Sequence, residues 1–173
     1  MILPIVFYGN PILRKKSIEI DIHSCRRTIN TLINDMFETI DKVQGIGLAA
    51  PQIGKNIRIF IIKTPFYNKN QDIINNYEEV FINAKIIKIY GELCNFNEGC
   101  LSIPGIMGYV KRKSHIIIEY YDHNWEKKKK TLQGICSRVI QHEYDHIEGK
   151  LFIDYFSSIK KRKIEKKLIN FFK

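Results

Sequence analysis

The H-E-x-x-H motif at His142–His146 constrains the fold of this chain more than any other feature, because its chemistry requires a helix. Residues four positions apart lie one turn apart on the same face of an α-helix. His142 and His146 can therefore offer two imidazole nitrogens to one metal ion. Glu143 follows the first histidine, and its carboxylate can reach water at that metal and act as a general base. The motif alone fixes neither the substrate nor the fold.

The third metal ligand does not stand where the longer metalloprotease motif would place it. A metzincin carries a third histidine six residues after the second one, and this chain has Phe152 there. After Gly149 the chain offers a single glutamate, Glu165, among lysines. We therefore expect the third ligand upstream of the helix.

The upstream segment EGCLS supplies such a candidate in Cys100. A cysteine thiolate and two histidines, with a fourth position left open, form a known catalytic metal site. Two alternatives stay open at this point. Cys100 could be a small buried hydrophobic residue, and Glu98 could orient a metal-binding histidine.

A third segment, GIGLAAPQ at residues 45–52, is rich in small residues. Glycine lets the backbone approach a ligand closely. The amide of Gln52 is a suitable donor to a developing oxyanion. The same segment could also be a helix end followed by a turn, since an amphipathic run precedes Gly45.

These three segments, in this order and with these separations, resemble the signature motifs of the peptide deformylases. The resemblance extends from Met1 to Asp154. It implies removal of the formyl group from the N-terminal formylmethionine of nascent polypeptides, with release of formate. It also implies that Glu143 is the base and that the Gln52 amide and the Leu101 backbone N–H stabilise the oxyanion.

The resemblance further implies one divalent metal ion, bound by Cys100, His142 and His146. Fe²⁺ is the native metal that it implies. Zn²⁺ or Ni²⁺ is expected in a purified sample, because most such sites bind these ions more tightly than Fe²⁺.

In the family, the peptide lies extended against backbone, in the manner of strand addition. The corresponding backbone here is that of Ile46, Gly47 and Gly99. The expected walls of an apolar methionine pocket are Ile46, Phe96, Ile135 and Val139. Arg138 shares the helix face of Ile135 and Val139, and we expect its stem to line the pocket while its charged head reaches the rim. Met107 stands where many family members carry an arginine.

Residue patterns along the chain predict an α+β fold in a single compact domain, residues 1–173. Apolar residues with helical spacing predict an N-terminal amphipathic helix over Ile29–Ile40, and the metal-binding helix spans Leu132–Glu148. β-Branched and aromatic residues predict strands at Arg58–Lys63, Val80–Tyr90 and His115–Tyr121. A basic exposed strand is predicted at Lys127–Leu132, and the polar segment Pro65–Tyr77 is predicted to be a loop. We expect small antiparallel or mixed sheets around the metal-binding helix.

Composition agrees with a globular protein of the cytoplasm. The chain has 173 residues, of which 45% are hydrophobic, enough to bury one core. The sequence shows no signal peptide, no transit peptide and no run long enough to span a membrane. If Cys100 binds metal, three of the four cysteines remain, an odd number that suits a reducing compartment. We expect a monomer.

The formal net charge of +10 suggests a polyanionic partner. Residues 157–173 form a predicted basic C-terminal helix with seven basic residues and one acidic residue. Its basic side chains before the last residue are Lys160, Lys161, Arg162, Lys163, Lys166 and Lys167. An apolar stripe runs along the same helix through Ile164, Leu168, Phe171 and Phe172. The helix could contact the ribosome through ribosomal RNA, or it could simply dock by its stripe with solvated lysines outside.

Two other functional classes stay open. A zinc endopeptidase would share H-E-x-x-H but would not need Cys100. A non-enzymatic basic RNA-binding protein would explain the charge but not the three motifs.

Overall fold

The computed structural model describes residues 1–67 and 73–171, except for the side chains at 66–67, 73–76 and 170–171. The α-helices are α1 (Arg26–Val43), α2 (Gly134–Ile147) and α3 (Ser158–Phe171). The strands are β1 (Gly47–Ala49), β2 (Ile59–Tyr67), β3 (Ile73–Cys100), β4 (Ile103–Tyr121) and β5 (Lys127–Gln133). Short 3₁₀ helices are η1 (Pro11–Arg14), η2 (Ala50–Ile53) and η3 (Phe152–Tyr155).

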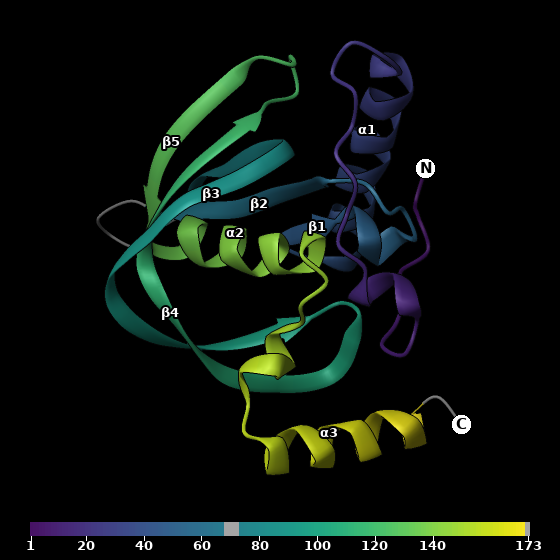
Figure 1. Cartoon of the computed structure of the whole chain (residues 1–173), viewed down its shortest axis with the longest axis vertical. Helices are drawn as coiled ribbons and strands as arrows, with labels where there is room; N and C mark the ends of the chain where they lie inside the picture. Colours follow the sequence, from purple (N-terminus) through teal and green to yellow (C-terminus); the bar gives the residue numbers. More distant parts are fainter. Residues whose placement is uncertain (68–72, 172–173) are drawn as a thin grey trace.

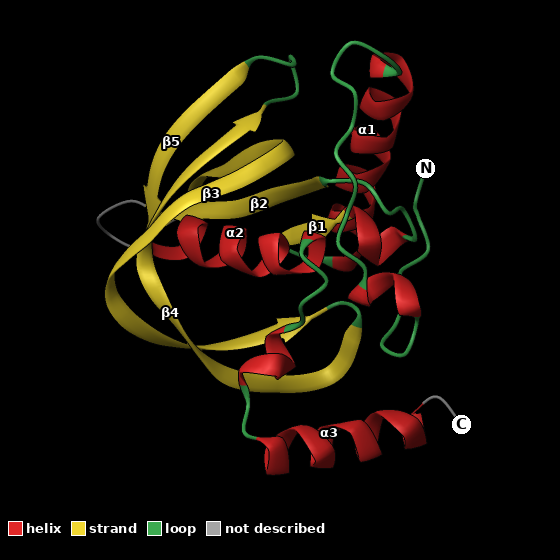
Figure 2. Ribbon diagram, viewed as in Figure 1, coloured by secondary structure: helices red, strands yellow, loops and turns green. Residues whose placement is uncertain are grey.

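The five strands form one sheet in sequence order, and every neighbouring pair of them is antiparallel. β3 pairs with β2 as far as Ile82 and then continues to Cys100 with β4 as its partner. Three register shifts between Ile82 and Leu93 interrupt the β3–β4 ladder. Such irregularities bend and twist a strand pair. The long β3–β4 pair accordingly curls around α2 (Figures 1 and 2).

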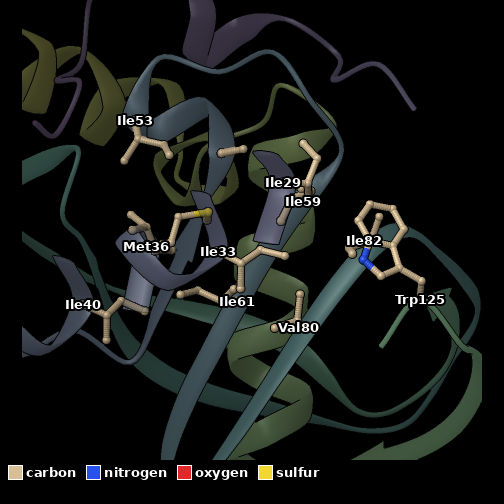
Figure 3. Close-up of a cluster of buried hydrophobic side chains, with 12 residues drawn as sticks. Ile29, Ile33, Met36, Ile40, Ile53, Ile59, Ile61, Val80, Ile82 and Trp125 are labelled. Carbon is tan, nitrogen blue, oxygen red and sulfur yellow. The ribbon is translucent and has the colours of Figure 1, made fainter. Parts of the chain in front are cut away.

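Helices α1 and α2 cover opposite faces of the sheet. The apolar residues of α1, among them Ile33 and Met36, pack on Ile59 and Ile61 of β2 (Figure 3). The alternate residues of β2, Phe60 and Ile62, pack in the cluster that contains Val139 and Ile140 of α2. This division follows from the two-residue period of a strand. Full burial of one such side chain contributes about 1.5–3 kcal/mol.

The predicted α+β class and a central helix with the H-E-x-x-H motif are confirmed. The strands of the sheet are all antiparallel, so the mixed alternative does not hold for them. The loop prediction for Pro65–Tyr77 is wrong at both ends, because residues 65–67 belong to β2 and residues 73–77 to β3. Cross-strand pairs such as Thr64 with Tyr77 impose the extended conformation there, and pairing outweighs the low strand propensity of asparagine. The middle of that prediction, residues 68–72, lies outside the described residues.

The C-terminal helix α3 lies beside the turn end of the β3–β4 pair (Figure 1). Its stripe residues Ile164 and Leu168 are buried in a cluster with Ile103 and Val110 of β4. The side chains of Phe171 and Phe172, also placed in the stripe, lie outside the described residues. None of the helices in the described part of the chain has the length and apolar character needed to cross a bilayer.

Candidate active site

Three potential metal ligands converge between α2 and the end of β3. The ligand atoms of Cys100, His142 and His146 all lie within 4.8 Å of one another. Cys100 Sγ is 3.3 Å from His146 Nε2. A soft thiolate with two imidazoles is a donor set that suits Zn²⁺, Fe²⁺ or Ni²⁺. The residues present therefore fit one divalent metal ion.

Glu98 orients the His142 ring by a hydrogen bond. It is not one of the three potential metal ligands. Its Oε2 accepts a hydrogen bond from His142 Nδ1 at 3.0 Å, which leaves Nε2 of that ring for a metal. Burial by itself would raise the pKa of Glu98, but hydrogen bonds from His142 and Arg112 outweigh it and hold the pKa at about 2. Glu98 is therefore a carboxylate at neutral pH. Arg112 also binds Asp145 of α2 at 2.7 Å and so ties β4 to the metal-binding helix.

Arg138 departs from its predicted position. Arg138 lines the cavity, but the whole residue is only 8% exposed. Its guanidinium donates to Glu98 Oε1 and to the carbonyl oxygens of Cys94 and Val110. A buried guanidinium is stable where several acceptors satisfy its donors. The predicted rim position of its charged head is therefore wrong.

The carboxylate of Glu143 lies buried beside the three potential ligands. The residue is 4% exposed, and its Oε2 has no hydrogen-bond partner among the described residues. Burial raises the pKa of Glu143 to about 7. A carboxyl group in such surroundings can exchange a proton near neutral pH.

The side chain of Gln52 is held by the backbone at the start of η2, the 3₁₀ helix in which Gln52 lies. Its Oε1 accepts a hydrogen bond from the backbone N–H of Ala49 at 2.8 Å. Its amide nitrogen lies 3.3 Å from Ser102 Oγ and 3.5 Å from Cys100 Sγ. The amide donor is thus directed at the cysteine end of the site. Leu101, the next residue after Cys100, lines the same cavity.

A cavity of about 530 Å³ connects these groups to solvent. All the residues that the sequence analysis assigned to substrate binding line it: Ile46, Gly47, Phe96, Gly99, Ile135, Arg138 and Val139. The lining also includes residues that the sequence motifs do not assign to substrate binding: Gln44, Gly45, Asn97, Pro104 and Met107. Met107 reaches the cavity because it is the cross-strand partner of Gly99. The sequence alone does not specify which residue of β4 pairs with Gly99.

Comparison with known proteins gives the family. Residues 2–162 match the sequence profile of polypeptide deformylase. The chain is 56% identical over 154 residues to the peptide deformylase of Karelsulcia muelleri (strain GWSS), covering 89% of this chain and 78% of that protein. The crystal structure of peptide deformylase from Ehrlichia chaffeensis matches with a TM-score of 0.87 at 33% identity, covering 100% of this chain and 98% of that one. A class I type b peptide deformylase from Acinetobacter baumannii, solved with bound Met-Ala-Ser, matches with a TM-score of 0.82 at 28% identity, covering 90% and 99% of the two chains. The chain therefore belongs to the polypeptide deformylase family.

Proposed function

We propose that this protein removes the formyl group from the N-terminal formylmethionine of nascent polypeptides and releases formate. Membership of the deformylase family supports this reaction. The single structural observation that carries it is the buried Glu143 carboxylate, which lines the same cavity as Cys100 and His142. Hydrolysis of an amide needs a base, an acid and a polarising group at one place.

Cys100, His142 and His146 are the proposed ligands of one divalent metal ion. The metal, when bound, supplies Lewis acidity, which lowers the pKa of water and polarises a carbonyl group. We propose Fe²⁺ as the native ion, and the resemblance of the motifs supports it. The same donors bind Zn²⁺ and Ni²⁺, so a purified sample can carry either.

Glu143 is the proposed general base and acid. It takes a proton from the attacking water as the oxygen bonds to the formyl carbon. It then passes that proton to the methionine nitrogen as the carbon–nitrogen bond breaks, which releases the free amine and formic acid, and the acid loses its proton to become formate at neutral pH. A pKa of about 7 suits both transfers, because the group is readily protonated and deprotonated near neutral pH.

Gln52 and Leu101 are the proposed oxyanion donors. The amide nitrogen of Gln52 lies beside Cys100, and the hydrogen bond from the Ala49 N–H to the amide oxygen fixes the orientation of the group. The backbone N–H of Leu101 follows the cysteine directly. Loss of one such donor typically costs about 2.7–4 kcal/mol of transition-state stabilisation.

The proposed peptide site is a slot between two open strand edges. Among the described strands, β1 pairs with β2 alone, and β3 beyond Ile82 pairs with β4 alone. The Ile46 carbonyl bonds to Lys63 of β2, so alternation turns the N–H and C=O of Gly47 toward the open edge. An extended peptide can add as a strand between Gly47 and Gly99.

The methionine side chain then enters the apolar pocket on the α2 side. The lining of the cavity on that side includes Phe96, Ile135, Arg138 and Val139. The Met-Ala-Ser bound by the Acinetobacter relative is the peptide that deformylation of formyl-Met-Ala-Ser would leave. This agreement supports a site for an N-terminal methionine.

We also propose that the protein acts in the cytoplasm as a monomer and meets its substrate at the ribosome. Docking of α3 through Ile164 and Leu168 leaves Lys163, Lys166 and Lys167 exposed. These cations could bind ribosomal RNA by neutralising phosphates.

The deciding experiment is an assay of formate release from formyl-Met-Ala-Ser by the Fe²⁺- or Ni²⁺-loaded protein, with casein as a parallel substrate. We expect formate and intact casein. The Glu143→Ala variant should keep its metal and lose at least about 100-fold in turnover, since general acid–base catalysis contributes that much or more. Casein cleavage without formate would identify an endopeptidase and contradict the proposal. Loss of metal from the variant would contradict the role of Glu143.

A further inference from the structure

The side chain of Arg138 joins three segments of the fold. Arg138 lies on α2, one turn before His142, and its guanidinium donates to Oε1 of Glu98 at 2.9 Å. The same guanidinium donates to the backbone carbonyl oxygens of Cys94 on β3 and Val110 on β4. One buried side chain therefore ties α2 to both strands of the long β3–β4 pair.

Glu98 is bonded from two successive turns of α2. Arg138 donates to its Oε1, and His142 Nδ1 donates to its Oε2 at 3.0 Å. Residues four positions apart lie on the same face of a helix, so both side chains can reach one carboxylate. The bond to Glu98 sets the orientation of the His142 ring, and such outer partners strongly affect metal affinity. Arg138 thus contacts the group that orients a proposed metal ligand.

The second cation at Glu98, Arg112, is shared with another carboxylate. Its Nε and one terminal nitrogen donate to Glu98, and its other terminal nitrogen donates to Asp145 at 2.7 Å. Glu98, Asp145 and both arginines are buried. Two buried carboxylates therefore face two buried guanidiniums, and removal of one charge leaves another without its partner. Without Arg138, Glu98 would compete with Asp145 for Arg112.

The tie between α2 and β3 matters because the proposed metal ligands come from these two elements. Cys100 stands at the end of β3, two residues after Glu98, whereas both histidines stand on α2. We propose that Arg138 is a positioning residue that fixes the Glu98 carboxylate between β3 and α2 and thereby supports metal binding by His142. This assignment rests on the proposed set of metal ligands.

Two simpler roles of Arg138 predict different results. Arg138 lines the cavity, and a residue that only shapes the pocket would change KM and leave metal affinity unaltered. A buried arginine that only stabilises the fold would change the free energy of unfolding. Arg58 offers a control for this second role, because it is 4% exposed and joins β3 to α2 through the Ala84 carbonyl and the Tyr144 hydroxyl.

The test measures the affinity of the full chain for Ni²⁺ by competition with a chelator, and formate release from formyl-Met-Ala-Ser at saturating Ni²⁺. Arg138→Met keeps a long apolar side chain in the cavity and removes every donor. We expect its Ni²⁺ affinity to fall about 10-fold, the lower end of the effect of outer partners, because Arg112 still holds Glu98. Arg58→Met should keep the wild-type Ni²⁺ affinity.

The kinetic readout separates positioning from pocket shape. At saturating Ni²⁺, kcat of Arg138→Met should fall, because displaced ligands also displace the reacting groups. KM should change little, since the apolar wall is kept.

A double-mutant cycle with Glu98→Gln tests whether Arg138 acts through Glu98. Each single variant should lose Ni²⁺ affinity. In the double variant the two losses should not multiply, because each change removes the same interaction. Arg138→Lys keeps the charge with fewer donors, so its loss should be smaller than that of Arg138→Met. It replaces Arg138→Met throughout if that variant does not fold.

The outcomes separate this proposal from the proposed function. Failure of the wild-type protein to bind Ni²⁺ would contradict the metal site. Bound Ni²⁺ without formate release would contradict the deformylase reaction, and the affinity comparison would still test Arg138. Wild-type Ni²⁺ affinity in the Arg138 variant, an equal loss in Arg58→Met, or losses that multiply in the double variant would each overturn the role of Arg138. A raised KM with unchanged Ni²⁺ affinity would make Arg138 a pocket wall instead.

Discussion

Gly47 of β1 faces the carboxylate of Glu143 so closely that a methyl group on residue 47 would overlap it. The two residues lie almost one hundred positions apart in the chain, and the sheet brings them together. Residue 47 must therefore be glycine, because the Glu143 carboxylate occupies the space that a side chain would need. A larger side chain at position 47 would displace the Glu143 carboxylate.

Gly47→Ala should displace the Glu143 carboxylate. We expect kcat/KM for formyl-Met-Ala-Ser to fall about 10- to 100-fold, because small misplacements of a catalytic group are costly. Stability should fall by about 1–3 kcal/mol, as for other overpacked sites. Gly45→Ala is the control, since a Cβ there meets its nearest neighbour at an ordinary 3.4 Å. Equal activity of the two variants would contradict this account.

Cys100→Ser should weaken metal binding sharply, because a neutral hydroxyl replaces a thiolate. We expect a loss greater than the roughly 10- to 100-fold that follows removal of an outer partner of a ligand. Metal content after dialysis, measured by elemental analysis beside Cys136→Ser, tests this. Cys136 is also a free cysteine, but it lies outside the ligand group. Full retention of metal by the Cys100 variant would mean that the third ligand lies elsewhere.

Because of Glu98, the free energy of unfolding of the metal-free protein should fall as the pH is lowered into the acid range. Its pKa is lowered from an ordinary 4.5 to about 2, so its contribution is present above about pH 4.5 and is lost as the pH falls toward 2. A shift of this size corresponds to about 3 kcal/mol at neutral pH. Urea unfolding should therefore show a large deficit for Glu98→Gln at pH 7 and a smaller one at pH 3. A deficit independent of pH would contradict the charged state of Glu98.

The exposed lysines of α3 offer a clean test of ribosome binding. Lys161 is less suitable, because it forms an ion pair with Asp154 at 2.7 Å, and Lys160 lies over the ring of Phe156 at 3.8 Å. We expect Lys163→Glu, Lys166→Glu and Lys167→Glu together to reduce ribosome co-sedimentation while leaving turnover on formyl-Met-Ala-Ser nearly intact.

Wild-type co-sedimentation should weaken steeply as salt rises, since each neutralised phosphate releases counterions. Reversal of three exposed lysines outside α3, Lys42, Lys55 and Lys113, serves as the matched control. If the α3 variant still co-sediments with ribosomes at low salt, the lysines of α3 do not bind the ribosome and only form a solvated helix face.

The sequence by itself determined the local parts of this site. Helical spacing predicted a metal-binding helix at Leu132–Glu148, and α2 spans Gly134–Ile147. The same period placed His142 and His146 on one face, because the geometry of a helix turn depends only on neighbouring residues. The motif order was enough to indicate the family, which the sequence comparison then confirmed.

Only the tertiary structure decided how distant segments meet. β3 continues to Cys100 through Asn95 and Asn97, residues with little strand propensity, because β4 pairs with them. Arg138 was expected at the rim, but acceptors on β3 and β4 draw its head inside. Likewise, Gly99 makes room for Met107 only in one cross-strand register. Hydrophobic periodicity and composition reflect interactions between residues close together in the sequence. The strand register and the bend of β3 arise instead from contacts between segments far apart in the chain.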